Sequence, residues 1–146
     1  MARVAILVAL LLAPLTARAG CAVALAIKPN GSIFTHSESS LTPMGGHNYI
    51  SAADAATALM DDLKRHGIPD AQLVFQSDET GYFSIAVGHT ADGKVVSDVA
   101  RAKDPRQSDR DALAAVKAKG AIDGSVSGRF HSYGDPAKDS SGTAPN

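Results

Sequence analysis

The chain has 146 residues, with 14 basic and 15 acidic side chains, five histidines and one cysteine. This near-neutral balance gives no basic footprint of the kind that binds nucleic acid. A single cysteine cannot form an internal disulfide, and the length suits one domain with one hydrophobic core. Because there is no tryptophan and few other aromatic residues, we expect that core to consist of Ala, Val, Leu and Ile.

The first nineteen residues are organised like a cleavable secretory signal peptide. A basic start at Arg3 precedes ten consecutive apolar residues, and Ala17 and Ala19 are the small residues that a signal peptidase requires. The apolar run is about half as long as a membrane span. We therefore predict cleavage before Gly20, a periplasmic or secreted protein, and no membrane span after cleavage.

Cys21 raises the alternative of a lipoprotein anchored through its thiol. A lipoprotein signal requires an aliphatic residue three positions before the cysteine, and this chain has Arg18 there. The better interpretation is that Cys21 begins a strand as a small apolar residue. Removal of residues 1–19 takes Arg3 and Arg18 away and leaves a formal net charge of −3.

The rest of the sequence contains one pattern twice. Two apolar segments flank Asn30-Gly31 in the first copy and Asp92-Gly93 in the second, 62 residues later. The segments are 22–27 and 32–35 in the first copy, and 84–87 and 94–97 in the second. Asn-Gly and Asp-Gly between apolar runs predict tight β-hairpins with type I′ turns. Each copy therefore begins with a hairpin.

A helix with matching ends follows each hairpin. We expect helices over Ser51–His66 and Ser108–Lys119, each beginning with a serine that can cap the helix and an aspartate three residues later. Apolar residues recur at the 3.6-residue period in both segments. Gly67 and Gly120 mark the ends of the two helices.

Another strand follows each helix, at 72–76 and at 125–130. The first strand of each copy is apolar on both faces, which favours a central position in a sheet. The sequence thus predicts an α+β fold with an internal duplication: one mixed or antiparallel sheet of about six strands with two helices on one face. The domain would span residues 20–133, followed by a disordered tail at 134–146.

The apolar first strand, the turn Asn30-Gly31-Ser32, the alanine-rich helix at 51–58 and their echo at 85–115 resemble an exported bacterial domain-of-unknown-function family. That family is built of two hairpin–helix–strand units, and the resemblance covers roughly residues 21–133. The family usually carries cysteines after its helices, which this chain lacks. The resemblance implies a location in the bacterial envelope or outside the cell, and it implies no activity.

Motifs for catalysis or metal binding are missing from the sequence. The five histidines have no His or Cys partner at metal-ligand spacing; they are His36, His47, His66, His89 and His131. The segment 124–128 is similar to G-x-S-x-G, but Val126 occupies the position of the nucleophilic serine. The sequence therefore predicts no catalytic residue, no metal and no cofactor.

The last strand is one candidate binding surface. Its alternation places Val126, Gly128 and Phe130 on one face, and Ser127, Arg129, His131 and Tyr133 on the other. The second face would gather a cation, an imidazole and a phenol, either as a recognition stripe or as an ordinary solvated strand face. We take Arg129, His131 and Tyr133 as candidate binding residues.

The loop at 37–50 is the other candidate, because it is five residues longer than its counterpart in the second copy. Loops held by a rigid sheet often carry binding residues. This loop contains Met44, His47 and Tyr49, a mixture of apolar, imidazole and phenol groups that suits recognition. An inert surface connection is the alternative.

Together these features predict a small exported binding or interaction domain without catalytic activity. It would act as an inhibitor, an immunity factor or an envelope accessory protein, with a protein partner in the cell envelope. The alternative is a periplasmic hydrolase, or a metal- or small-molecule-binding protein, that uses His47 or His131. Two histidines and a carboxylate in one cleft would favour chemistry, whereas dispersed histidines would favour binding.

Overall fold

The computed structural model describes residues 20–39 and 51–133, so the expected signal peptide (1–19) and tail (134–146) lie outside the described residues. The described chain forms six strands and two helices. In chain order they are β1 (Cys21–Ile27), β2 (Ile33–Ser39), α1 (Ala52–Arg65), β3 (Gln72–Ser77), β4 (Gly81–His89), β5 (Val95–Ala102), α2 (Pro105–Ala118) and β6 (Ser125–Ser132).

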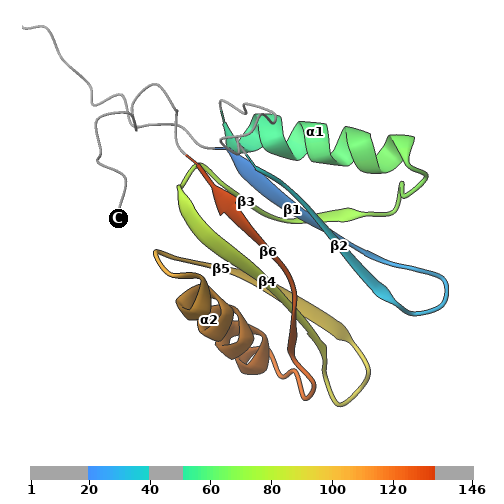
Figure 1. Cartoon of the computed structure of the whole chain (residues 1–146). Coiled ribbons are helices and arrows are strands. Elements are labelled where there is room, and N and C mark those ends of the chain that lie inside the picture. The colour runs from blue at the N-terminus through green and yellow to red at the C-terminus, as the bar shows by residue number, and fades with distance from the viewer. Residues whose placement is uncertain (1–19, 40–50, 134–146) are drawn as a thin grey trace, which may run out of the picture.

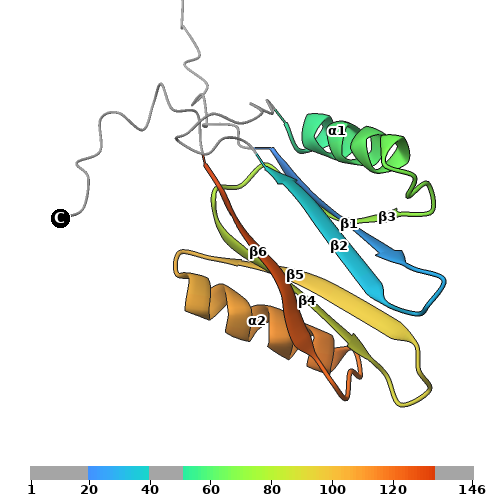
Figure 2. The same cartoon turned by 45° about the vertical axis from the view of Figure 1, so that its right-hand side comes forward.

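The strands form two three-stranded antiparallel sheets, with orders β2-β1-β3 and β5-β4-β6. The α+β class and the six strands are confirmed, but the expected single sheet is wrong. Figures 1 and 2 show the two sheets between the helices, with α1 outside one sheet and α2 outside the other. The helices therefore lie on opposite sides of the molecule, and not on one face of one sheet.

The apolar character of both faces of the central strands explains this arrangement. In β1, Ala22, Ala24 and Ala26 pack in the core beneath α1, whereas Cys21 and Val23 are fully buried on the opposite face. One sheet with both helices on the same face would leave that opposite face in water. Stacking two sheets covers it, because each sheet then shields the inner face of the other.

Phenylalanine side chains fill the space between the sheets. Phe83 of β4 is 1% exposed, and its ring stacks on that of Phe130 of β6 with the centroids 5.0 Å apart. The ring of Phe75, on β3 of the other sheet, lies 5.7 Å from the Phe83 ring. The expected core of Ala, Val, Leu and Ile is therefore correct beneath the helices and incomplete between the sheets.

Both helices are confirmed, but the start of the second one is corrected. Ser51 caps α1, and its hydroxyl accepts a hydrogen bond from the backbone N–H of Asp54, as the sequence predicts. The second helix, α2, begins at Pro105 with Asp104 as its cap, so Ser108 is a buried residue inside the helix and not its cap. Proline suits the first turn because its missing N–H would have no partner there.

Both hairpins are confirmed, with a different turn from the one expected. In the first hairpin, the N–H of Gly31 donates to the carbonyl of Lys28 at 2.8 Å, and the N–H of Lys28 donates to the carbonyl of Ser32 at 2.9 Å. These bonds enclose a three-residue loop, whereas a type I′ turn has two. Gly31 and Gly93 have φ of 80° and 79°, the left-handed conformation that such a loop requires at its third residue.

The two halves also share an irregularity that the sequence pattern does not show. A β-bulge follows Val23 of β1, and another follows the equivalent Ile85 of β4, 62 residues later. The extra residues are Val74 on β3 and Ser127 on β6. In addition, β2 contacts β6 while β3 contacts β5, so the halves pack with approximate two-fold symmetry.

Candidate functional site

Two of the predicted binding residues lie on β6, on the outer face of its sheet, and a third lies directly after the strand. Phe130 points inward to Phe83, and its neighbours Arg129 and His131 consequently point outward. Tyr133 follows the strand and contacts His131. The expected grouping of Arg129, His131 and Tyr133 on one face is therefore confirmed.

The bulge on β6 changes the faces of the residues before Gly128. Ser127, expected beside Arg129, shares a hydrogen bond of 3.0 Å with Thr35 of β2 on the inner side. Val126, expected on the core face with Phe130, lies opposite Ala86 in the layer that α2 covers. The simple alternation is wrong for these two residues, because one extra residue shifts every earlier side chain to the other face.

Arg129 is paired with a carboxylate and is not a free cation. Its Nε and Nη2 donate to Oδ1 and Oδ2 of Asp109 on α2, at 2.8 and 2.9 Å. Asp109 Oδ1 also accepts from the hydroxyl of Ser84 at 2.6 Å, and Ser84 is hydrogen-bonded to the buried Ser108. The Arg129 guanidinium holds the pKa of Asp109 below its usual range. Arg129 thus joins β6 to α2.

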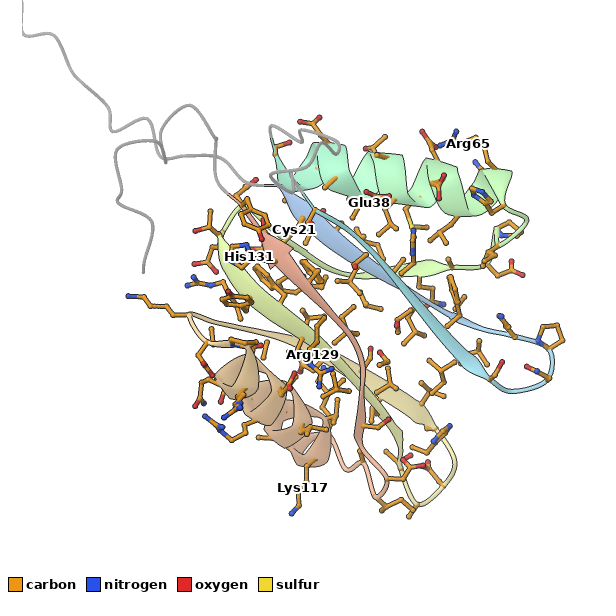
Figure 3. All side chains as sticks on the ribbon, viewed as in Figure 1. Cys21, Glu38, Arg65, Lys117, Arg129 and His131 are labelled. Atoms are coloured by element: carbon orange, nitrogen blue, oxygen red, sulfur yellow. The ribbon has the colours of Figure 1, made fainter. Side chains whose placement is uncertain are left out.

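His131 lies between two tyrosines, and we call Tyr82, His131 and Tyr133 the aromatic cluster. The Tyr82 ring meets the imidazole edge-on with the centroids 4.4 Å apart, and the Tyr133 ring is tilted at 4.0 Å. Tyr82 is 38% exposed, and His131 and Tyr133 are half-buried. Figure 3 places His131 near one end of the sandwich, past Arg129.

The imidazole of His131 is unusual in its polar contacts. Its Nδ1 is buried and has no hydrogen-bond partner within the described residues. Burial lowers the pKa of His131, because an imidazolium loses hydration there. The side chain is therefore neutral near pH 7 and acts as an aromatic group.

The other predicted binding residues, Met44, His47 and Tyr49, lie outside the described residues. The described chain resumes at Ser51, whose backbone carbonyl packs closely against Gly20. A Cβ added to Gly20 would lie 2.0 Å from the carbonyl oxygen of Ser51. At the other flank, the hydroxyl of Ser39 donates to the backbone carbonyl of His131 at 3.4 Å. Segment 40–50 therefore joins residues at the same end of the sandwich as the aromatic cluster.

Cys21 lies at this same end of the molecule, where Figure 3 labels it near His131. Its side chain is fully buried, and its thiol donates to the carbonyl of Ser77 at 3.4 Å. Burial raises the pKa of Cys21 to about 11, although the neighbouring hydroxyl of Ser132 partly offsets this effect. The thiol is therefore protonated at neutral pH, which is the opposite of an activated nucleophile.

Two of the remaining described histidines, His36 and His66, come together at one carboxylate, but they do so on the exposed surface beside α1. His36 and His66 both approach Asp62, at 3.9 and 3.3 Å, but the His66 side chain is 69% exposed and Arg65 binds the same carboxylate. No group of three or more His, Cys, Asp or Glu residues in 20–39 and 51–133 is arranged to hold a metal ion.

A histidine–aspartate pair occurs at the opposite end of β4. His89 Nδ1 lies 2.9 Å from Oδ2 of Asp123, and the backbone N–H of His89 donates to the other oxygen of the same carboxylate. Such a pair orients an imidazole in hydrolases. Among the described residues, however, no serine, threonine or cysteine side chain bonds this imidazole, so the pair fastens the connection between α2 and β6 to β4.

Sequence reasoning missed Tyr82 and Asp109. Tyr82 has a readable signal, because it directly precedes Phe83 and must point away from the core if Phe83 points into it. Asp109 has none, since it precedes Arg129 by 20 residues and meets it only when α2 packs on the sheet.

No helix of the described residues is both long enough and apolar enough to cross a membrane. Comparison of the chain with protein-family models, curated proteins and solved structures gives no match.

Proposed function

We propose that this protein is a small exported binding domain that recognises a protein partner of the cell envelope through the aromatic cluster. The observation that carries the proposal is that Tyr82 and Tyr133 each contact the imidazole of His131, while all three residues stay partly exposed at the surface. Tyrosine is enriched at binding hot spots because a large ring with few rotatable bonds loses little entropy when it is covered. Rings already held against one another lose still less.

The position of Cys21 supports export without a lipid anchor. The first strand begins at Cys21, so cleavage before Gly20 would leave the whole domain intact. The Cys21 side chain is fully buried, and a lipid attached to its sulfur would have to leave the core. We therefore propose a periplasmic or secreted protein with a free cysteine.

The alternative, a hydrolase or a metal- or small-molecule-binding protein that uses His47 or His131, has less support. A catalytic imidazole needs a group that orients it and a reacting group within hydrogen-bond reach. His131 instead contacts two phenol rings, and its Nδ1 has no partner within the described residues. His47 lies outside the described residues.

The test is capture of a partner from envelope extract with three immobilised baits. They are the wild type, the double variant Tyr82→Ser/Tyr133→Ser, and the control Ile122→Ser. Ile122 is 73% exposed and follows α2 near His89, at the end of β4 remote from the cluster. We expect the wild type and the control to retain the same partner, and the double variant to lose it.

Affinity measured with the purified partner should fall at least about 30-fold in the double variant, as expected when two hot-spot rings are removed. Thermal unfolding of all three baits must show that they are folded. A partner bound equally well by all three baits would contradict the proposal and would place the binding surface elsewhere.

A further inference from the structure

The buried Nδ1 of His131 is a polar atom that binding through aromatic rings does not explain. Buried polar atoms are nearly always hydrogen-bonded, because an orphan loses its hydration without compensation. Within the described residues this nitrogen has no partner. The least costly arrangement leaves a bare lone pair on Nδ1 and places the ring proton on Nε2. The geometry therefore favours one neutral tautomer.

The groups around the imidazole are uncharged. Tyr82 of β4 and Tyr133 contact the ring, and Ser39 of β2 bonds the backbone carbonyl of His131. Charged side chains on the surrounding elements are engaged elsewhere. Arg129 pairs with Asp109, Arg101 pairs with Glu79, and Asp104 caps α2. Glu38 lies opposite Ala22, on the side of β2 that faces α1. No carboxylate of the described residues is placed to accept a hydrogen bond from a protonated Nδ1.

We propose that His131 makes the aromatic cluster acid-sensitive: the cluster is closed while the imidazole is neutral and opens when the imidazole is protonated. Protonation creates a charged N–H donor at Nδ1, for which the described residues offer no acceptor. The ring must then turn to bring this donor to water, and turning it breaks the contacts with Tyr82 and Tyr133. Attraction between an imidazolium and the tyrosine rings opposes the movement, but it does not supply the missing acceptor.

The effect of burial on this histidine has the direction that the proposal requires. The pKa of His131 is lowered by burial, so the opening falls below the pKa of a histidine in the unfolded chain. Between the two pKa values of His131, the unfolded chain binds more protons than the folded protein does. The free energy of unfolding therefore decreases as the pH falls through the pKa of His131 in the unfolded chain, and the decrease levels off below its pKa in the folded protein. The opening of the cluster in acid depends only on the aromatic cluster itself. The further step, that this opening regulates partner binding, rests on the proposed function.

The test is an NMR titration of the purified protein from about pH 8 to about pH 4.5, a range that covers the ordinary titration of histidine and reaches only the upper part of that of the carboxylates. Ring protons of His131, Tyr82 and Tyr133 are followed, together with the nuclear Overhauser effects between the rings. The matched variants are His131→Phe, which keeps a ring that cannot titrate, and His66→Gln, which removes an exposed histidine.

In the wild type and in His66→Gln, we expect the ring-to-ring Overhauser effects to disappear with the titration of His131. The midpoint should lie below that of the same histidine in urea. In His131→Phe the effects should persist throughout. If that variant does not fold, the wild-type titration decides alone.

Three results would overturn the switch: a midpoint at or above the value in urea, contacts that persist while His131 titrates, or an acid opening that remains in His131→Phe. These results do not depend on a partner. If partner binding is lost in Tyr82→Ser/Tyr133→Ser while no opening is seen by NMR, the proposed function stands and the switch does not.

Discussion

Phe83 provides the strongest test of the stacked sheets, because its neighbour Tyr82 points to the opposite face. The Phe83 side chain is 1% exposed and contacts one ring within its own sheet and one ring of the other sheet. Replacement by Ala should destabilise the protein by about 3–5 kcal/mol through lost burial and a cavity. Phe83→Leu retains much of the volume and loses two ring pairs worth about 0.5–1.5 kcal/mol each, so it should cost about 1–3 kcal/mol. A domain of this size is stable by about 5–15 kcal/mol in total.

Urea unfolding followed by far-UV circular dichroism measures these differences, with Tyr82→Ala as the matched control. Tyr82 is 38% exposed, so its truncation should cost about 1 kcal/mol or less. Costs for Phe83→Ala and Tyr82→Ala that are equal within error would contradict the stacked arrangement, because they would mean that the inner face of β4 is no better covered at Phe83 than the outer face is at Tyr82. Phe83→Leu supplies the measurement if Phe83→Ala does not fold.

Three other predictions concern single residues. Because Arg129 lowers the pKa of Asp109 in the folded state, the stability advantage of the wild type over Asp109→Asn is present above about pH 4 and shrinks as the pH falls through the folded pKa. Melting curves at a series of pH values measure it, and a difference independent of pH would argue against the ion pair. The Cys21 thiol, with its pKa raised to about 11, should react with a water-soluble disulfide reagent at about pH 8 only when the protein unfolds; rapid reaction of the native protein would show that the thiol is accessible. Gly88→Ala places a Cβ 2.9 Å from the Cβ of Ala121, so it should lower the free energy of unfolding, measured in urea, by about 1–3 kcal/mol. An unchanged unfolding midpoint would mean that this contact is looser than described.

Most of the secondary structure of this protein could be predicted, because local signals specify it. Asn30-Gly31 and Asp92-Gly93 mark both hairpins, and Ser51 marks the start of α1. The predicted start of α2 at Ser108 is wrong, because Ser108 also has the form of a cap. The stronger signal was Asp104 followed by a proline in the first turn.

The candidate site was predictable only where the strand alternates without interruption. Arg129, His131 and Tyr133 share a face, as expected, and they separate into an ion pair and an aromatic cluster because of residues far away in the sequence. Asp109 takes up the charge of Arg129, and Tyr82 completes the cluster. The alternation of a single strand cannot identify such partners.

The duplicated order of hairpin, helix and strand can be predicted from local signals, since hydrophobic period, turn residues and helix caps act within a few residues of one another. The apolar residues on both faces of the first strand of each copy also indicated a central position in a sheet. How the two faces of these strands are covered is visible only in the folded molecule: two sheets stack with the helices outside, and Phe83 packs against Phe75 between them. Several arrangements bury the same apolar residues, and the choice between them depends on side-chain packing across elements that are distant in the chain.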